Sequence, residues 1–263
     1  ILLLSVISLS STTMQAHKTS TPDGSSVAPL ITLHTQQEVG AEVNLVIAGE
    51  NIHLSGIELI REEEQFGEIV YTYKVLDKDI SISGDVTKLS IDYFDVDQIK
   101  LQKASTIREL SCNSNPLESL DVTSCTSLQV LDCGSCSLSR LDLSQAPALT
   151  YLDCSNNSLT ELDLSNNAKL ETLSVQQNGL TAMNLSALQD LTYLIISKNA
   201  LGTLDLSKNL KLKNLQADEI GLTRIDLSAN KQLELLHLAQ NKLQTFSLES
   251  LTLKELYIND NNL

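Results

Sequence analysis

The sequence predicts a solenoid of 21-residue coils with one parallel β-sheet, preceded by a small all-β capping module. Apolar residues recur at a step of 21, so Leu149 is followed by Leu170, Leu191, Leu212 and Leu233, and preceded by Leu128, Ile107 and Val86. Within each period apolar and polar residues alternate over a few positions, as in a half-buried strand. The chain is 42% hydrophobic but only 3% aromatic, so its core must be aliphatic.

One copy, residues 149–169, reads LTYLDCSNNSLTELDLSNNAK. Its pattern LxxLxLxxNxL, followed by LxL, resembles the leucine-rich repeat. Each copy is expected to begin with a short strand, Leu152-Asp153-Cys154 here, with leucine and cysteine inward and alternate residues outward. In such repeats the Asn157 amide is expected to bond the backbone of neighbouring turns. No copy buries its core alone, so neighbours must stack.

The N-terminal 29 residues are expected to lie outside the folded domains. Residues 1–16 are an apolar run that fades into serine and threonine, too short for a transmembrane helix, and they resemble the apolar part of a signal peptide. This resemblance implies export. Residues 17–29 contain Pro22-Asp23-Gly24 and are expected to be a flexible linker.

Residues 30–85 lack the period of 21 and show strand alternation instead. Strands are expected at residues 30–35, 42–47, 52–59, 70–76 and 79–83, and the charged run at 61–65 is expected to be a solvated hairpin end. A solenoid exposes its core at its first coil, so this module is predicted to be a cap.

Residues 86–263 are predicted to form the solenoid. The first copy is irregular, because Phe94 occupies the turn position where asparagine is expected. Ile220 interrupts the asparagine column again, and its coil is the expected place for local irregularity. The last copy begins at Leu253 and is incomplete at Leu263, which favours a fragment of a longer protein. The turn positions of the regular copies are Asn115, Cys136, Asn157, Asn178, Asn199, Ile220 and Asn241.

The five cysteines are expected to be structural. Cys112, Cys133 and Cys154 share one inward strand position in successive copies and behave as small buried hydrophobes. Cys133-Gly134-Ser135-Cys136 is a CxxC motif, which is found in redox and zinc sites. Since the repeat accounts for both residues and no second CxxC exists, the structural interpretation is favoured.

The net charge of −15 excludes some partner classes. Nucleic acid and anionic membranes require clustered lysine and arginine, so neither is an expected partner, and no membrane insertion of the mature chain is expected. An aspartate column, Asp121, Asp142, Asp163, Asp205 and Asp226, precedes serine or threonine by two positions and is expected to build turns. Calcium is the less favoured alternative, because six or more oxygen ligands are not evident.

Function is expected on the outward residues of the parallel sheet. Toward its start this face is acidic, with Asp92, Glu109, Asp132 and Asp153. Toward its end it gathers apolar and aromatic side chains, which is what a partner-binding hot spot requires. Single exposed apolar residues are normal, and this is the alternative interpretation. The predicted binding residues are Tyr151, Tyr193, Ile195, Leu235, His237 and Tyr257.

Catalysis finds no support in the sequence. His17 lies in the leader or linker, His34 and His53 lie in predicted cap strands, and His237 has no evident nucleophile beside it. The chain is therefore expected not to be an enzyme, with no catalytic residues, no metal and no cofactor.

The copies also resemble the internalin-like repeats of exported Bacteroides-type bacterial proteins, through Asp153-Cys154-Ser155-Asn156-Asn157 and Leu162-Asp163-Leu164-Ser165. The period differs, since internalins proper resemble repeats of 22. The resemblance implies an exported or cell-surface protein that binds a host-cell or bacterial surface protein in adhesion. Two alternatives stay open. One is a glycan-binding module that stacks sugars on Tyr151, Tyr193 and Tyr257, and the other is a passive spacer for a C-terminal domain.

Overall fold

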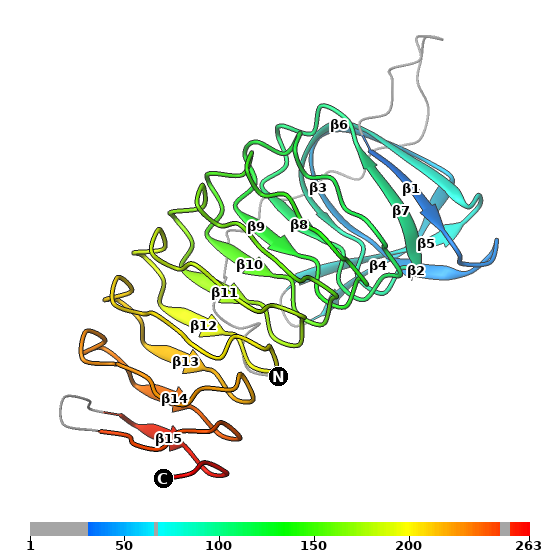
Figure 1. The fold of residues 1–263 in the computed structure, drawn as a ribbon. Coiled ribbons are helices and arrows are strands. Elements are labelled where there is room, and N and C mark those ends of the chain that lie inside the picture. The colour runs from blue at the N-terminus through cyan, green and yellow to red at the C-terminus, as the bar shows by residue number, and fades with distance from the viewer. Residues whose placement is uncertain (1–30, 66–67, 248–252) are drawn as a thin grey trace.

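The computed structural model describes residues 31–65, 68–247 and 253–263. Its strands form a twelve-stranded sheet and a three-stranded sheet (Figure 1). The leader and linker predicted for residues 1–29 lie outside the described residues.

The capping region contains seven strands. They are β1 (Ile31–Thr35), β2 (Glu42–Asn44), β3 (Val46–Ser55), β4 (Ile57–Gln65), β5 (Glu68–Val75), β6 (Asp79–Ser90) and β7 (Val96–Leu101). In the large sheet β1 lies between β6 and β7, and β3 pairs with the other edge of β6. Strands β2, β5 and β4 form the small antiparallel sheet.

Three predictions within the cap are wrong in detail. The strand expected at 42–47 is divided at Leu45 between β2 and β3, which belong to different sheets. The strand expected at 52–59 is divided at Gly56 between β3 and β4, because this glycine has φ +86° and its Cα lies against the Asp79 backbone, where a Cβ would come within 2.5 Å of the carbonyl oxygen. The charged run Arg61–Gln65 is strand, not hairpin end, and pairs with β5. Its residues tolerate a strand because β4 is an edge of the small sheet and their side chains at 61–64 are exposed.

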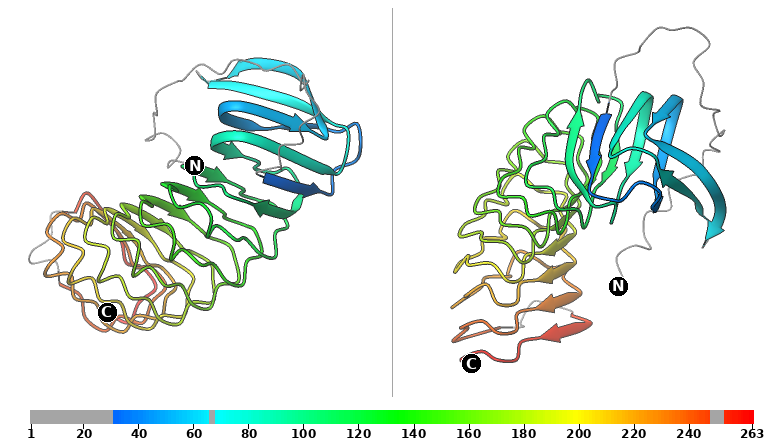
Figure 2. Two further views of the ribbon diagram at one scale, coloured as in Figure 1. Left: turned by 90° about the horizontal axis from the view of Figure 1, so that it is seen from above. Right: turned by 90° about the vertical axis from the view of Figure 1, so that its right-hand side faces the viewer.

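Strand β6 joins the cap to the solenoid. Its first half pairs antiparallel with β1, through Ile82 opposite Ile31, while its last three residues pair parallel with the first regular coil, through Leu89 opposite Leu110. The sheet therefore continues from cap to solenoid without a break (Figure 2). Leu89, Ile91 and Phe94 of the irregular first copy are all buried, as its core positions predict.

Eight further short strands continue the sheet. They are β8 (Glu109–Ser111), β9 (Val130–Asp132), β10 (Tyr151–Asp153), β11 (Thr172–Ser174), β12 (Tyr193–Ile195), β13 (Asn214–Gln216), β14 (Leu235–His237) and β15 (Glu255–Tyr257). All pair in parallel, in register at a step of 21 residues until the last pair, where the step is 20. The central leucine of every strand from β8 to β14 is buried, so the predicted solenoid and its inward face are confirmed.

An asparagine column satisfies the backbone where each strand ends. Asn199 shows the pattern. Its Nδ2 donates to the carbonyls of Ile196 (2.9 Å) and Val175 (3.0 Å), and its Oδ1 accepts the Leu180 N–H (3.1 Å). In the second coil of this column Cys136 stands in place of asparagine. Its Sγ takes over the donor role of the amide Nδ2, because it donates to the carbonyls of Cys112 and Gly134.

The coil of Ile220 is irregular, as predicted. Ile220 is fully buried and has no amide to offer to its neighbours. In the coils before it, residues such as Ala200 donate an N–H to the Leu180 carbonyl, whereas here Gly202 donates to the Ile220 carbonyl at 2.8 Å. Both Gly202 and Gly221 have positive φ, which lets the two turns rearrange.

A second asparagine column lies on the return side and was not predicted. Asn167, Asn209 and Asn230 are fully buried, and each donates through Nδ2 to two carbonyls, as Asn209 does to Leu185 and Leu188. These residues therefore hold successive coils together on the side opposite the sheet.

The aspartate column builds turns, as predicted. In five coils an aspartate Oδ1 accepts the N–H two residues later at 2.9–3.0 Å, and Asn184 does the same to Ser186. Hydrogen bonds from the Thr or Ser hydroxyl, which are the largest cause at Asp121 and Asp226, and these N–H bonds lower the pKa of the aspartates, because both favour the charged form.

Candidate partner-binding face

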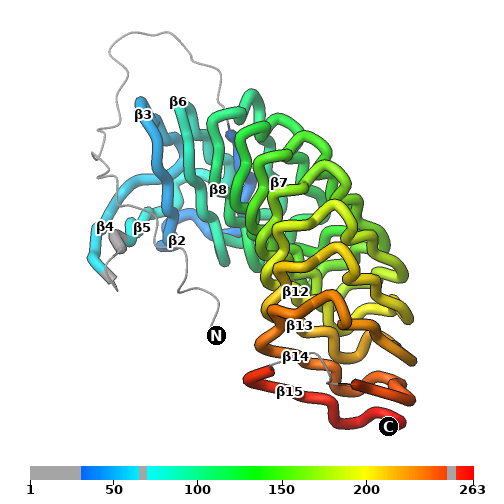
Figure 3. The backbone as a smooth tube through the Cα atoms, turned by 90° about the vertical axis from the view of Figure 1, so that its left-hand side faces the viewer, coloured from blue at the N-terminus to red at the C-terminus, as the bar shows by residue number. Residues whose placement is uncertain are grey.

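The outward residues of the parallel strands form a continuous face, here called the concave face. Each strand presents its first and third residues to this face, because side chains alternate along a strand. The parallel register aligns these residues in columns, so that Ile195, Gln216, His237 and Tyr257 stand opposite one another in sequence. Figure 3 shows the strands succeeding one another along the arc of the solenoid.

Five of the six predicted residues come together at one end of this face. Tyr193, Ile195, Leu235 and His237 are half-buried, and Tyr257 is 51% exposed. The rings of His237 and Tyr257 are in edge-to-face contact, with centroids 4.4 Å apart and an interplanar angle of 61°. Here these five residues are called the apolar cluster. Only Asn214 and Gln216 of β13 separate its two halves.

Tyr151 lies apart from the apolar cluster. It is on β10, two strands from Tyr193, and stands opposite Val130 and Thr172, with Asp153 and Asp132 as the nearby charges on the face. Burial, and then these two carboxylates, raise the pKa of its hydroxyl. The structure therefore places Tyr151 within the acidic part of the face.

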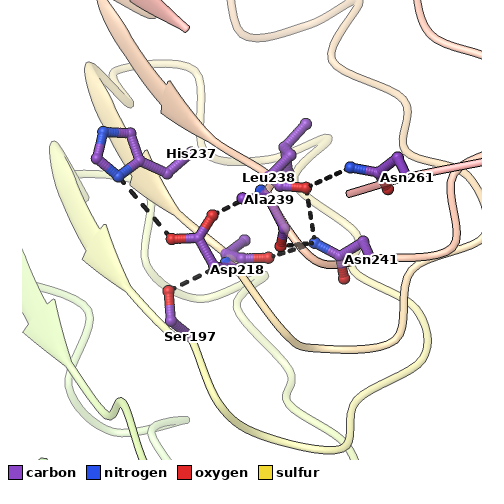
Figure 4. Close-up of polar contacts among 8 residues, drawn as sticks. Ser197, Asp218, His237, Leu238, Ala239, Asn241 and Asn261 are labelled. Atoms are coloured by element: carbon purple, nitrogen blue, oxygen red, sulfur yellow. Dashed lines mark hydrogen bonds and ion pairs between the residues drawn. The ribbon is translucent and has the colours of Figure 1, made fainter. Parts of the chain in front are cut away.

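Asp218 is a residue of the cluster region that the sequence analysis did not select. Its Oδ2 lies 3.9 Å from His237 Nδ1, and its Oδ1 accepts the Ala239 N–H at 2.6 Å (Figure 4). Its own N–H donates to Ser197 Oγ at 3.0 Å. Its position two residues after Gln216 continues the outward alternation of β13, and a histidine lies in the following strand. These two signals could have identified Asp218, since the two positions are diagonal neighbours. Asp218 thus lies beside the His237 ring, at a distance longer than a hydrogen bond, and is itself held by Ser197 and Ala239.

The opposite end of the face is acidic. Asp92 accepts hydrogen bonds from Ser90, Ser111 and the Asn113 N–H, and Glu109 forms an ion pair with Lys88 at 3.1 Å. Asp132 and Asp153 are direct neighbours in register. Burial is the main cause that raises the pKa of Asp132 to about 6, and repulsion by Asp153 and Asp92 adds to it.

Four cysteines lie at the strands and turns under this face, and Cys125 lies on the return side, in the column of Asn167. All five fall in the described part of the chain and are buried free thiols, with Cys112, Cys133 and Cys154 stacked in successive coils. Burial raises the pKa of Cys133 well above its usual value and that of Cys125 to about 11. Both buried thiols are therefore protonated at neutral pH.

Comparison with known proteins agrees with this architecture. The functional domain of InlJ from Listeria monocytogenes, which includes a cysteine ladder, superposes with a TM-score of 0.64 and 30% identity, over 72% of this chain and 48% of that one. The fold is that of a leucine-rich repeat protein. An internalin from Listeria monocytogenes (TM-score 0.56, 22% identity) matches over 60% of this chain and 49% of its own. A leucine-rich repeat protein from Leptospira interrogans (0.55, 23%) matches over 60% and 44%.

This leucine-rich repeat chain spans about half the length of the structures that it matches. No protein-family model and no curated protein sequence matches it. Within the described residues no group of three histidine, cysteine, aspartate or glutamate side chains is placed to hold a metal ion. The described part of the chain also contains no helix of the length and hydrophobicity that crossing a bilayer requires.

Proposed function

We propose that the chain is a non-enzymatic protein-binding module that holds its partner on the concave face. The observation that carries the proposal is the apolar cluster: Tyr193, Ile195, Leu235, His237 and Tyr257 gather on four neighbouring strands of an otherwise polar sheet. Burying such side chains supplies binding energy, while the polar residues around them exclude water. Tyr151 would contact the partner at the edge of the acidic part.

The likeness to leucine-rich repeat proteins supports a protein-interaction module in general. We further propose that the protein is exported or displayed at the cell surface of a bacterium and binds a host-cell or bacterial surface protein in adhesion. The apolar run at residues 1–16 and the resemblance to internalin-like repeats support this context.

The test is a double variant, Tyr193→Ala with Tyr257→Ala, compared with the parent in pull-downs from host-cell and bacterial surface extracts. Tyr93→Ala is the matched control, because Tyr93 is 77% exposed and follows β6 at the far end of the solenoid sheet. We expect a captured protein to be retained by the parent and the control and lost by the double variant. Affinity measured on that protein should fall by 10-fold or more.

Equal capture by all three proteins would contradict the placement on the concave face. Capture of no protein, together with binding to immobilised glycans that the double variant loses, would support the glycan alternative. Circular dichroism of the variants must match the parent, so that a loss of binding reports the face and not unfolding.

A further inference from the structure

A groove crosses the solenoid on its return side, opposite the sheet. Its volume is about 1010 Å³, and it spans four consecutive coils. Each coil contributes one apolar residue to its floor: Leu120, Leu141, Leu162 and Met183. Leu120 and Leu141 are 6% and 8% exposed, while Leu162 and Met183 are half-buried. The floor is thus an apolar stripe across the coils, and its accessible part lies mainly at Leu162 and Met183.

One side of this groove carries a row of carboxylates. Asp121, Asp142 and Asp163 line it, one coil apart. Each uses Oδ1 to accept the N–H of its own turn, and none of the ion pairs between described residues involves them. Their pKa values are lowered, so they stay ionised well below neutral pH. The other side has Arg140 and Glu161, whose charges have opposite signs and offset each other.

The coil spacing matches the pitch of an α-helix. Neighbouring strands of the sheet are about 4.8 Å apart, and the return side, on the outside of the curve, is more widely spaced. An α-helix advances about 5.4 Å per turn, so a helix along the groove meets one coil with each turn. Four coils correspond to about 15 helical residues at the same pitch. Alternate side chains of an extended strand repeat at about 6.6 Å and would fall out of step with the coils.

We propose that this groove binds an amphipathic α-helix of a partner protein, with the apolar stripe of the helix on the floor and a flank of lysine or arginine along the three aspartates. Helices commonly bind in this way, with apolar residues at a spacing of three or four as anchors. Charge complementarity selects the basic flank, because the groove has three aspartates without a matching cation. The site is separate from the concave face.

The probe for this proposal is a fluorescein-labelled 18-residue helical peptide with a leucine stripe and a lysine flank. A second peptide has glutamate in place of each lysine. Binding of both to the full chain is measured by fluorescence anisotropy at low and at physiological salt. We expect saturable binding of the lysine peptide that weakens with salt, and at least 10-fold weaker binding of the glutamate peptide.

The chain itself supplies a matched pair of variants for the aspartates. Asp142→Asn with Asp163→Asn removes two charges but keeps the turns, since Asn184 builds the same turn with Ser186 at 3.0 Å. Asp205→Asn with Asp226→Asn makes the same change in coils that do not line the groove. We expect the first pair to weaken the lysine peptide about 5-fold and the second less than 2-fold.

The floor is tested in the same way. Met183→Gln should weaken the lysine peptide at least 3-fold, because Met183 lines the groove. Ile225→Gln is its control, since Ile225 is the half-buried equivalent two coils later. Tyr193→Ala with Tyr257→Ala should leave peptide binding unchanged, which separates this site from the proposed function.

Three results would overturn the proposal: no binding of the lysine peptide, equal binding of both peptides, or equal losses in the groove variants and their controls. Loss of peptide binding in the tyrosine variant would place the peptide on the concave face and overturn it as well. The first three results do not bear on the partner of the concave face.

Discussion

The concave face contains one carboxylate, that of Asp132, whose charged form is destabilised by its surroundings. Its carboxylate accepts hydrogen bonds from the Gly134 N–H (3.1 Å) and Asn113 Nδ2 (3.1 Å), yet its pKa is raised to about 6. Burial and the neighbouring Asp153 and Asp92 outweigh the two donors. A carboxylate whose charged form is destabilised in the free protein can be kept in a sequence when that charge contributes to binding.

This pKa predicts a pH-dependent stability. An unfolded aspartate has a pKa of about 3.9, so the folded chain binds this proton more tightly. The contribution of Asp132 to the free energy of unfolding therefore falls as pH rises from about 4 to 6, by about 3 kcal/mol, and is constant above. Asp132→Asn keeps the Oδ1 acceptor without the charge. We expect it to stabilise the chain at pH 7 by that amount and not at pH 4, as measured by urea unfolding. A gain of equal size at both pH values would contradict the prediction.

At the scale of the elements, the coils are joined by their turns as much as by their strands. Each strand is only three residues long, whereas each asparagine of the turn column bonds two coils through both ends of its amide. Where Ile220 interrupts the column, the backbone of the preceding turn shifts to a different partner. The column therefore determines the conformation of the turns.

Removing one member of the column should be costly. Asn199→Ala leaves the carbonyls of Val175 and Ile196 and the N–H of Leu180 without this partner in a buried turn. We expect a loss of about 3 kcal/mol in the free energy of unfolding, measured by urea denaturation. Asn166→Ala, on an exposed turn residue, is the control and should change stability by less than about 0.5 kcal/mol. Equal effects of the two variants would mean that the amide bonds are replaced by water.

The solenoid elements could be predicted from the sequence because their apolar period is physically demanding. The concave columns followed from it, and the structure places every member as the register requires. Strand β7 was missed because it lies within the first copy, where the repeat predicts a return segment. It forms because the N-terminal β1 is available to pair with it. Asn167, Asn209 and Asn230 were missed because an asparagine in a polar loop gives no sign that it is buried.

At the scale of the whole molecule, β6 makes cap and solenoid one cooperative structure. Ile82 on β6 is fully buried and stands opposite Ile31 of β1 and Leu54 of β3. Each coil contacts only its neighbours, so stability is passed from the cap along the array.

A cavity in the cap should therefore loosen the nearest coils first. Ile82→Ala is expected to cost about 3 kcal/mol locally. Hydrogen exchange should show a similar loss of protection at Leu110 of β8 and a smaller loss at Leu236 of β14. Unchanged protection at Leu110 would show that cap and solenoid unfold independently. An equal loss at both leucines would show that the array unfolds as one unit.

The constant register between coils also has a consequence for how such a chain can change in length. Every junction from β8 to β14 repeats the same strand register at a step of 21 residues, so a whole coil could be duplicated or deleted there without changing the strand pairing. The junction at β6 allows no such copying, because one strand serves two partners of different kinds. Genetic variation in this protein should accordingly change the length of the concave face in steps of one coil, always C-terminal to an unchanged cap.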